Sequence, residues 1–377
     1  MNLLSILRDK GSITQDEYNA LVYAAENEDK EVQKAVAKQV ADAAPASGWW
    51  DNTKVSGRMY YNFSYINNRR SGVRQSNSDT GFDTKRFYVG IDHKFNDIFS
   101  GNVTTDFTYD SGAGATQVYI KKAYLDAKIN DALDLRLGST DLPWVPFVEG
   151  IYGYRYVENV MIDRTKFGTS ADWGIHAKGN LGGTFQYAVA MVNGAGYKHP
   201  SVHSSGIDFE GRLSANWNNF IVGVGGYVGN LGKDTKGTTR FHTASRFDAI
   251  GAYKTSAITL GIEYFYARNW TAITSAASDT AEGFSVFGSY RFNPEWAVFG
   301  RYDYVEPNQD TSSDLNDDYF NVGIAYSPAS IVDFSLVYKR DHAGDGSLST
   351  GNGTIGGLTA LDSGTYEEVG LFGRFRW

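Results

Sequence analysis

Two alternating runs, Leu133-Asp-Leu-Arg-Leu-Gly138 and Trp173-Gly-Ile-His-Ala-Lys178, enclose the stretch of sequence that decides the fold. Each run has one apolar and one polar face when alternate residues are grouped, which is typical of a β-strand. Segment 139–170 between them is long, lacks clear periodicity and mixes aromatic with charged residues. Such long connections between strands are uncommon and often functional. We therefore expect a membrane β-barrel into which segment 139–170 folds, narrowing its pore.

The clearest strand pattern lies at 54–65. One set of alternate residues is mainly apolar or aromatic (Val55, Gly57, Met59, Tyr61, Phe63 and Tyr65) and the other mainly polar (Lys54, Ser56, Arg58, Tyr60, Asn62 and Ser64). Alternation this long cannot be a helix face. A water-soluble sandwich would bury the apolar set, whereas a membrane barrel would turn it toward lipid. The same pattern recurs up to Trp377.

The connections between the expected strands alternate in length. Seven are tight turns, such as Asn96-Asp97 and Asn293-Pro-Glu295, and the longer ones include 67–83, 194–206, 230–242, 270–280, 306–318 and 341–364. Short turns on one side and longer loops on the other, with an even strand count, are typical of outer-membrane barrels. The sequence therefore predicts an all-β fold: a 16-stranded antiparallel transmembrane β-barrel over 53–377, with an N-terminal α-helical extension.

The composition is compatible with this fold. The chain has 42 Gly, 25 Tyr and 22 Phe but only 7 Pro and no Cys. No run approaches the ~20 apolar residues of a spanning helix, and the net charge of −8 argues against nucleic acid as a partner. The start, Met1-Asn-Leu-Leu-Ser-Ile-Leu-Arg8, is too short for a signal peptide and charged too early. We expect a mature form, with the signal peptide removed, in the bacterial outer membrane.

Residues 1–44 differ from the rest and predict a periplasmic helical segment, followed by a linker at 45–52. Thr14-Gln-Asp-Glu17 has the spacing of a capping box. The following residues have a seam at spacings of four and three, formed by Tyr18, Val22, Ala25, Asp29, Val32, Val36, Gln39 and Ala43. This seam is compatible with an oligomeric coiled coil, although Asp29 and Gln39 weaken it. The alternative is a surface helix that packs on the barrel or frays.

The sequence contains no catalytic or metal-binding signature. The six histidines are scattered, and His199 and His203 share a Gly/Ser-rich loop without metal-ligand spacing. Four carboxylates in one loop, Asp310, Asp314, Asp317 and Asp318, could bind calcium weakly, although a solvated acidic loop also explains them. We expect neither enzyme activity nor a cofactor.

The inward-facing residues of the expected strands include many charges, which a water-filled lumen tolerates and a packed core does not. The expected pore-lining residues are Arg58, Arg86, Lys122, Lys178, Arg212 and Arg301. Basic residues slightly outnumber acidic ones, and basic rings select anions. The alternative is that these charges only bridge neighbouring strands.

One stretch resembles a known family. Lys121-Lys-Ala-Tyr-Leu-Asp-Ala-Lys128, then Leu135-Arg-Leu-Gly138, then Pro143 to Glu149, resembles the "AYL" strand, "RxG" strand and long loop of the phosphate-selective porin O/P family. The N-terminal segment also looks like the periplasmic helical extension of some relatives. The resemblance implies a homotrimer of sixteen-stranded pores, each narrowed by its third loop.

The sequence also departs from this family, whose phosphate-selective members present a dense basic ladder to the pore. Here loop 139–170 contains acidic as well as basic residues, so we do not transfer phosphate specificity. The residues expected at the constriction are Arg136, Glu149, Arg155, Glu158, Asp163, Arg164 and Lys166.

These observations predict a porin of the Gram-negative envelope that lets small hydrophilic solutes and ions diffuse passively, with a slight preference for anions. Its expected partners are outer-membrane lipid and two further copies of the chain. One alternative is a structural barrel that tethers the outer membrane to the cell wall through the N-terminal helix. A second is an outer-membrane hydrolase with residues assembled from distant strands.

Overall fold

The computed structural model describes residues 2–43, 48–110 and 114–377. The chain forms two compact units, Met1–Asn52 and Thr53–Trp377, which we describe separately. Within the described ranges, no helix combines the length and the apolarity needed to cross a bilayer.

The first unit contains α1 (Asn2–Asp9), α2 (Gln15–Ala43) and the 3-10 helix η1 (Trp49–Asn52). The predicted capping box is present: the Glu17 backbone N–H donates to Thr14 Oγ1 at 3.2 Å, and the Thr14 N–H donates to Glu17 Oε2 at 2.8 Å. Hydrogen bonds from the Thr14 backbone and side chain lower the pKa of Glu17. On α2 the seam residues Val32 and Val36 are both exposed.

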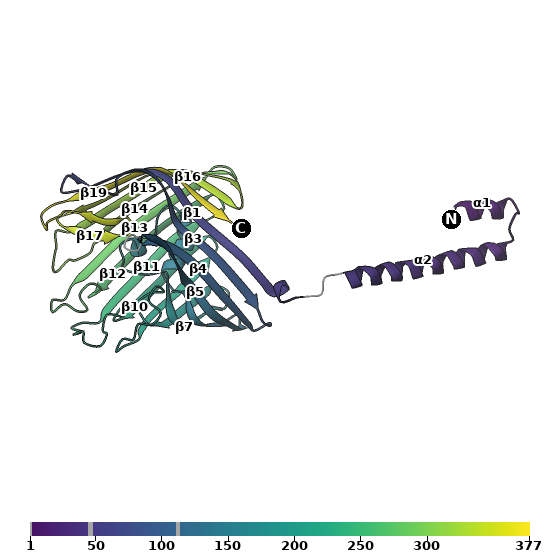
Figure 1. Ribbon diagram of the computed structural model, residues 1–377, viewed down its shortest axis with the longest axis horizontal. Coiled ribbons are helices and arrows are strands. Elements are labelled where there is room, and N and C mark those ends of the chain that lie inside the picture. Colours follow the sequence, from purple (N-terminus) through teal and green to yellow (C-terminus); the bar gives the residue numbers. More distant parts are fainter. Residues whose placement is uncertain (1, 44–47, 111–113) are drawn as a thin grey trace. The chain divides into compact units, whose positions relative to one another are not determined.

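The second unit is a closed antiparallel barrel of 16 long strands, which confirms the predicted fold class (Figure 1). β1 pairs with β19 on one side and with β3 on the other, closing the sheet. The long strands are β1 (Thr53–Arg70), β3 (Asp79–Lys94), β4 (Phe99–Asp110), β5 (Ala115–Asn130), β6 (Leu133–Asp141), β7 (Ala171–Leu181), β8 (Phe185–Val192), β9 (Asp208–Trp217), β10 (Phe220–Gly229), β11 (Ala244–Lys254), β12 (Ile258–Arg268), β13 (Thr280–Arg291), β14 (Trp296–Glu306), β15 (Asn316–Ala329), β16 (Val332–Gly344) and β19 (Gly364–Arg376). The short strands are β2 (Val73–Arg74), β17 (Ser347–Thr350) and β18 (Gly353–Gly356).

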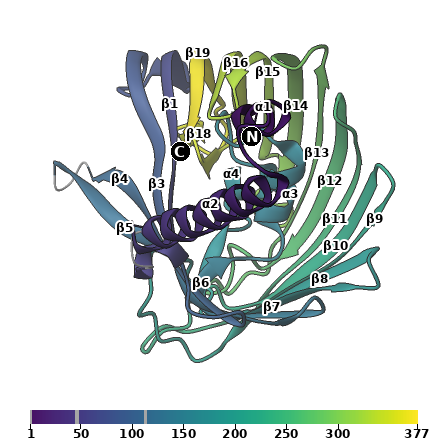
Figure 2. The same ribbon diagram turned by 90° about the vertical axis from the view of Figure 1, so that its right-hand side faces the viewer.

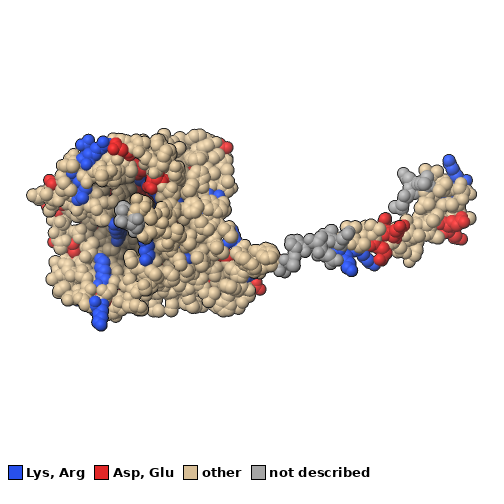
Figure 3. All heavy atoms as spheres, viewed as in Figure 1, with Lys and Arg blue, Asp and Glu red and all other residues tan. Residues whose placement is uncertain are grey.

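The outer face of the barrel carries the apolar residues of each strand. On β10, Val222, Val224 and Val228 are about half exposed, whereas Tyr227 points inward and is buried. Figure 3 shows that Lys, Arg, Asp and Glu are sparse over the strand wall on this face and lie mainly toward its ends. An uncharged apolar band of this kind matches the hydrocarbon layer of a bilayer.

Two predicted loops are shorter than expected. β1 continues to Arg70 and β3 begins at Asp79, which shortens the predicted loop 67–83. β16 continues to Gly344, and the β17–β18 hairpin lies within the predicted loop 341–364. Beyond the bilayer neither strand face meets lipid, so the apolar alternation ends while the backbone ladder continues.

Candidate functional site

The connection between β6 and β7, residues 142–170, folds into the barrel and is called L3 below. It contains two helices that the sequence analysis did not predict, α3 (Val145–Tyr152) and α4 (Met161–Arg164). Figure 2 shows both within the ring of strands. Near the start of L3, the backbone N–H of Trp144 donates to Glu210 on β9 at 2.9 Å. The indole N–H of Trp144 donates to Glu263 on β12 at 2.8 Å. L3 therefore reaches strands that lie two and five places beyond β7 in the sheet.

An apolar core fixes L3 to one side of the barrel. Trp144, Val145, Val148, Met161 and Ile162 of L3 are fully buried. They belong to one cluster with inward-facing residues of β10–β14 and the loops between them, which include Tyr227, Ile250, Phe265, Trp270, Ile273, Phe287 and Val305. Part of the inner wall that contacts L3 is therefore apolar, which the sequence analysis did not predict.

Arg164 at the end of α4 lies in a fully buried ionic cluster. Its guanidinium is 3.2 Å from Asp303 on β14, 2.6 Å from Asp317 on β15 and 3.0 Å from Asp341 on β16, and all four side chains are inaccessible to solvent. The guanidinium also stacks on the Tyr319 ring at 4.4 Å. A buried cation with this many carboxylate contacts ties L3 to three neighbouring strands.

A second buried ionic cluster involves Glu158 of L3. Lys339 Nζ on β16 is 3.2 Å from Glu158 and 2.5 Å from Glu368 on β19. Burial alone would raise the pKa of Glu158, but the charges of Lys339 and Lys85 outweigh it and hold this pKa below its ordinary value. Glu158 is therefore ionised at neutral pH and is a second anchor of L3.

The space left by L3 is a cavity of about 660 Å³, called the main cavity below. Its charged lining is six basic side chains and two carboxylates: Arg58, Lys121, Lys122, Arg155, Arg374 and Arg376, with Asp141 and Glu149. Other lining residues come from β1, β3 and β4, including Ser56, Tyr60, Tyr88 and Thr104, and Trp377 follows β19. The main cavity thus lies between L3 and the wall opposite the apolar core, and its lining is mainly basic.

A smaller cavity of about 220 Å³ shares Asp141 and Pro146 with the main cavity. It is lined by Arg136, Lys178 and Arg212 as well as Asp134. Arg136 is 2.6 Å from Asp126, whereas the Arg212 guanidinium lies 3.9 Å from the centre of the Phe147 ring. Basic side chains therefore continue along the wall from the main cavity.

The structure brings together some of the predicted site residues. Arg58, Lys122, Glu149 and Arg155 line the main cavity, and Arg136, Lys178 and Arg212 line the smaller one. Arg155 is paired with Glu149 and lies 3.6 Å from Asp163. Burial raises the pKa of Asp163 despite the opposing effect of Arg155. Arg86 lines neither cavity and is 3.7 Å from Asp106.

Besides Arg86 and Asp163, four further predicted residues line neither cavity. Arg164 and Glu158 are buried between L3 and the wall, and Arg301 is also buried, paired with Asp303 at 2.8 Å. They therefore anchor L3 or its wall and do not line water. Lys166 is exposed and donates to Ser349 at 2.5 Å, away from both cavities. Partners on β14–β16 are far from L3 in sequence, so the sequence alone gave no indication of them.

Sequence reasoning also missed Lys121, which lines the main cavity. Strict alternation along 115–130 assigns Lys122 to the inner face and Lys121 to the outer face, yet both point inward. The reason is a break in the strand register, analysed below.

The structure does not favour the calcium alternative for Asp310, Asp314, Asp317 and Asp318. Asp317 is bound to Arg164, while Asp318 accepts a hydrogen bond from Tyr302 at 2.5 Å on the other strand face. Asp317 and Asp318 therefore lie on opposite faces of β15. Among the residues that the structure describes, no group of three or more His, Asp or Glu side chains could hold a metal ion.

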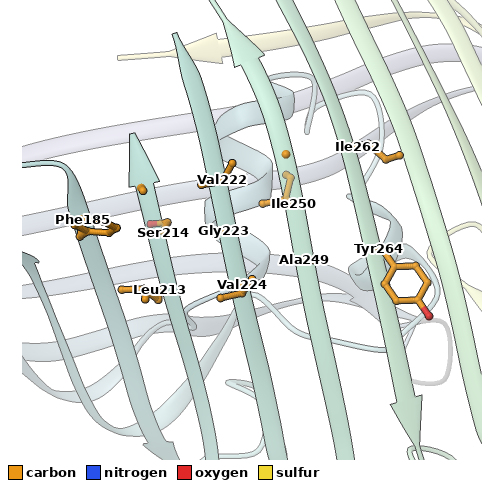
Figure 4. A pocket seen from close by; sticks show the side chains of 12 residues that line it. Phe185, Leu213, Ser214, Val222, Gly223, Val224, Ala249, Ile250, Ile262 and Tyr264 are labelled. Atoms are coloured by element: carbon orange, nitrogen blue, oxygen red, sulfur yellow. The ribbon is translucent and has the colours of Figure 1, made fainter. Parts of the chain in front are cut away.

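An apolar hollow of about 410 Å³ lies on the outer wall and is not part of the pore (Figure 4). Its rim includes Leu213, Val222, Val224 and Ile262, which belong to the exposed set of β9, β10 and β12. This surface faces lipid in a transmembrane barrel.

Comparison with known proteins supports the fold. No protein-family model matches the chain, and no curated protein matches it. The anion-selective porin from Comamonas acidovorans superposes with a TM-score of 0.60 at 12% identity, covering 86% of this chain and 99% of that chain. A loop L8 deletion mutant of OmpT, an outer membrane protein of Vibrio cholerae, gives a TM-score of 0.60 at 14% identity with the same coverage. In-vitro folded OmpT in its trimer form gives 0.58 at 13% identity, again over 86% and 99%.

At these identities the likeness establishes the fold alone. The resemblance to the phosphate-selective O/P family is therefore supported only as far as the 16-stranded barrel shared with these outer-membrane proteins.

Proposed function

We propose that this chain is an outer-membrane porin through which small hydrophilic solutes and ions diffuse passively, with a preference for anions. The observation that carries the proposal is the main cavity, where six basic side chains face two carboxylates beside an anchored L3. Many of the buried carboxylates of the barrel are bound at the L3 anchors, as Asp303, Asp317, Asp341 and Glu368 are. Anions entering the lumen therefore meet mainly positive charge.

The fold supports this function over catalysis. A barrel with a polar cavity inside and an apolar band outside is suited to passage of water-soluble molecules. The anion-selective porin from Comamonas acidovorans has the same architecture. Phosphate specificity is not part of the proposal.

Purified protein in a planar bilayer is expected to form channels that pass chloride more readily than potassium. The test is the reversal potential in a potassium chloride gradient. Arg58→Gln, in the main cavity, removes a Coulomb interaction of roughly 0.7 kcal/mol at ~6 Å in water, which attracts chloride and repels potassium. The two permeabilities should each change about threefold in opposite directions, so the chloride-to-potassium permeability ratio should fall about tenfold. The control is Arg74→Gln, which removes a charge paired with Asp79 in the first loop and should leave the ratio nearly unchanged. A cation-selective or silent wild-type protein would contradict the proposal.

We also propose that the protein is a homotrimer with its helical unit in the periplasm. The exposed seam residues Val32 and Val36 on α2 support association of helices from several copies. The trimer form of Vibrio cholerae OmpT gives further support from the shared barrel architecture. Tethering to the cell wall through this helix stays the alternative to this proposal.

A further inference from the structure

β3 and β5 each contain a β-bulge, and the extra residue in each is a lysine. Opposite β1, Tyr60 pairs with Arg86 and Tyr61 pairs with Thr84, so Lys85 is left over. Opposite β4, Thr104 pairs with Lys122 and Thr105 pairs with Ile120, so Lys121 is left over. A bulge sets two residues against one and redirects a side chain.

The bulges place consecutive basic residues on the inner face. In an unbroken strand one residue of each pair, Lys85-Arg86 and Lys121-Lys122, would point to lipid. Instead Lys85 Nζ lies 4.0 Å from Glu368, and Lys121 Nζ donates to the Tyr88 hydroxyl at 3.1 Å. Both partners are on the inner face.

Lys121 differs from the other three basic residues of these pairs. Lys85, Arg86 and Lys122 each lie within 4.0 Å of a carboxylate, and for Lys122 the distance to Asp141 is 2.6 Å. Across the described ranges 2–43, 48–110 and 114–377, no carboxylate lies that close to Lys121. Its ammonium lies instead over the rings of Tyr88 and Tyr197, at 4.7 and 5.7 Å.

The ammonium of Lys121 is buried beside the main cavity and has hydrogen-bond donors that an anion could use. Lys121 is only 8% exposed, and although the charges of Glu149 and Asp141 attract its ammonium at longer range, neither carboxylate lies within 4.0 Å to accept its hydrogen bonds. Its ammonium has three N–H donors, of which Tyr88 accepts one. Tyr88, as the acceptor of that bond, keeps its own O–H available for donation. Both residues line the main cavity, so two donors face a solute there.

We propose that Lys121 and Tyr88 bind the carboxylate, or another small oxyanion group, of a solute in the main cavity. Two oxygens of one oxyanion can accept from the ammonium and the phenol together, and such charge-assisted hydrogen bonds are the strong ones. This inference rests on the proposed function and names the chemistry of the solutes that are favoured.

The test uses single-channel current in potassium chloride while potassium succinate is added. In the wild type, succinate is expected to reduce the chloride current with a saturating dependence. Lys121→Met should weaken the apparent affinity for succinate about tenfold, because one charge-assisted hydrogen bond is lost. Tyr88→Phe should weaken it about threefold, and Lys121→Arg should largely retain it.

Lys122→Met is the comparison variant. It removes one positive charge from the same cavity, but that charge is already neutralised by Asp141. Its effect on succinate should therefore be clearly smaller than that of Lys121→Met. Equal effects of Lys121→Met and Lys122→Met on succinate affinity would overturn this inference, as would an unchanged succinate affinity in both Lys121→Met and Tyr88→Phe. Neither result would contradict the proposed porin function. Absence of any wild-type channel in potassium chloride would instead refute the proposed function. If Lys121→Met does not fold, the Tyr88→Phe and Lys121→Arg results decide.

Discussion

Replacing Arg164 with methionine is expected to destabilise the folded barrel by about 3–5 kcal/mol, the usual result of removing one partner from a buried ion cluster. Methionine preserves much of the volume of the side chain but leaves Asp303, Asp317 and Asp341 without their shared cation. These carboxylates are inaccessible to solvent, so water cannot replace the guanidinium. L3 would lose the ionic attachment that Arg164 makes to β14, β15 and β16, while the contact of Glu158 with Lys339 on β16 would remain.

The measurement is the midpoint of denaturant-induced unfolding in detergent, followed by tryptophan fluorescence. Lys166→Met is the matched control, because Lys166 is two residues away, exposed and outside the cluster. Its effect should stay within about 0.5 kcal/mol. An Arg164→Met protein that unfolds at the same denaturant concentration as Lys166→Met would show that the cluster does not stabilise L3.

Replacing Trp144 with alanine is expected to destabilise the barrel by about 3–5 kcal/mol, as for a large core side chain. The indole is fully buried and donates to Glu263 at 2.8 Å, which would lose this donor. The fit is close on the wall side too: a Cβ added to Gly225 on β10 would lie 2.6 Å from the indole. Gly225→Ala should therefore also destabilise the protein, through the same contact.

Trp217→Ala is the control for Trp144→Ala. Trp217 lies at the end of β9 and is 71% exposed, so its loss should cost about 1 kcal/mol or less. The same unfolding measurement applies, with loss of a tryptophan fluorophore common to both variants. A loss of stability as large in Trp217→Ala as in Trp144→Ala would contradict the assignment of Trp144 to the core between L3 and the wall.

The barrel was predictable because lipid imposes a pattern on every strand. The alternation that recurs up to Trp377 places Val222, Val224 and Val228 on one strand face, and all three are about half exposed. The strand ends were less predictable, since beyond the bilayer both faces meet water. The bulges at Lys85 and Lys121 leave no mark in the alternation, so strict parity assigned Lys121 to the wrong face.

The side of the barrel that holds L3 was signalled in the sequence but not recognised. On β12 the alternate residues Ile262, Tyr264 and Tyr266 face outward. Phe265, which lies between two of them, is an aromatic residue that faces the inside of the barrel. Phe287 on β13 is a second such exception. Apolar residues at the inward-facing positions of neighbouring strands therefore identify the part of the wall that L3 covers. The partners of Arg164 could not be found this way, because an inward Asp has the same pattern whether it meets water or a guanidinium.

The central claim is that L3 covers the β10–β14 wall and that solutes pass on its other side. The chain has no native cysteine, so single cysteines report on water access without background. Thr104 lines the main cavity, and Ser285 on β13 is 1% exposed. We would introduce Thr104→Cys and Ser285→Cys separately and add a negatively charged methanethiosulfonate reagent during bilayer recording. The account predicts that the current falls in Thr104→Cys and stays constant in Ser285→Cys. A fall in Ser285→Cys with no change in Thr104→Cys would place the water path on the opposite side of L3 and contradict it.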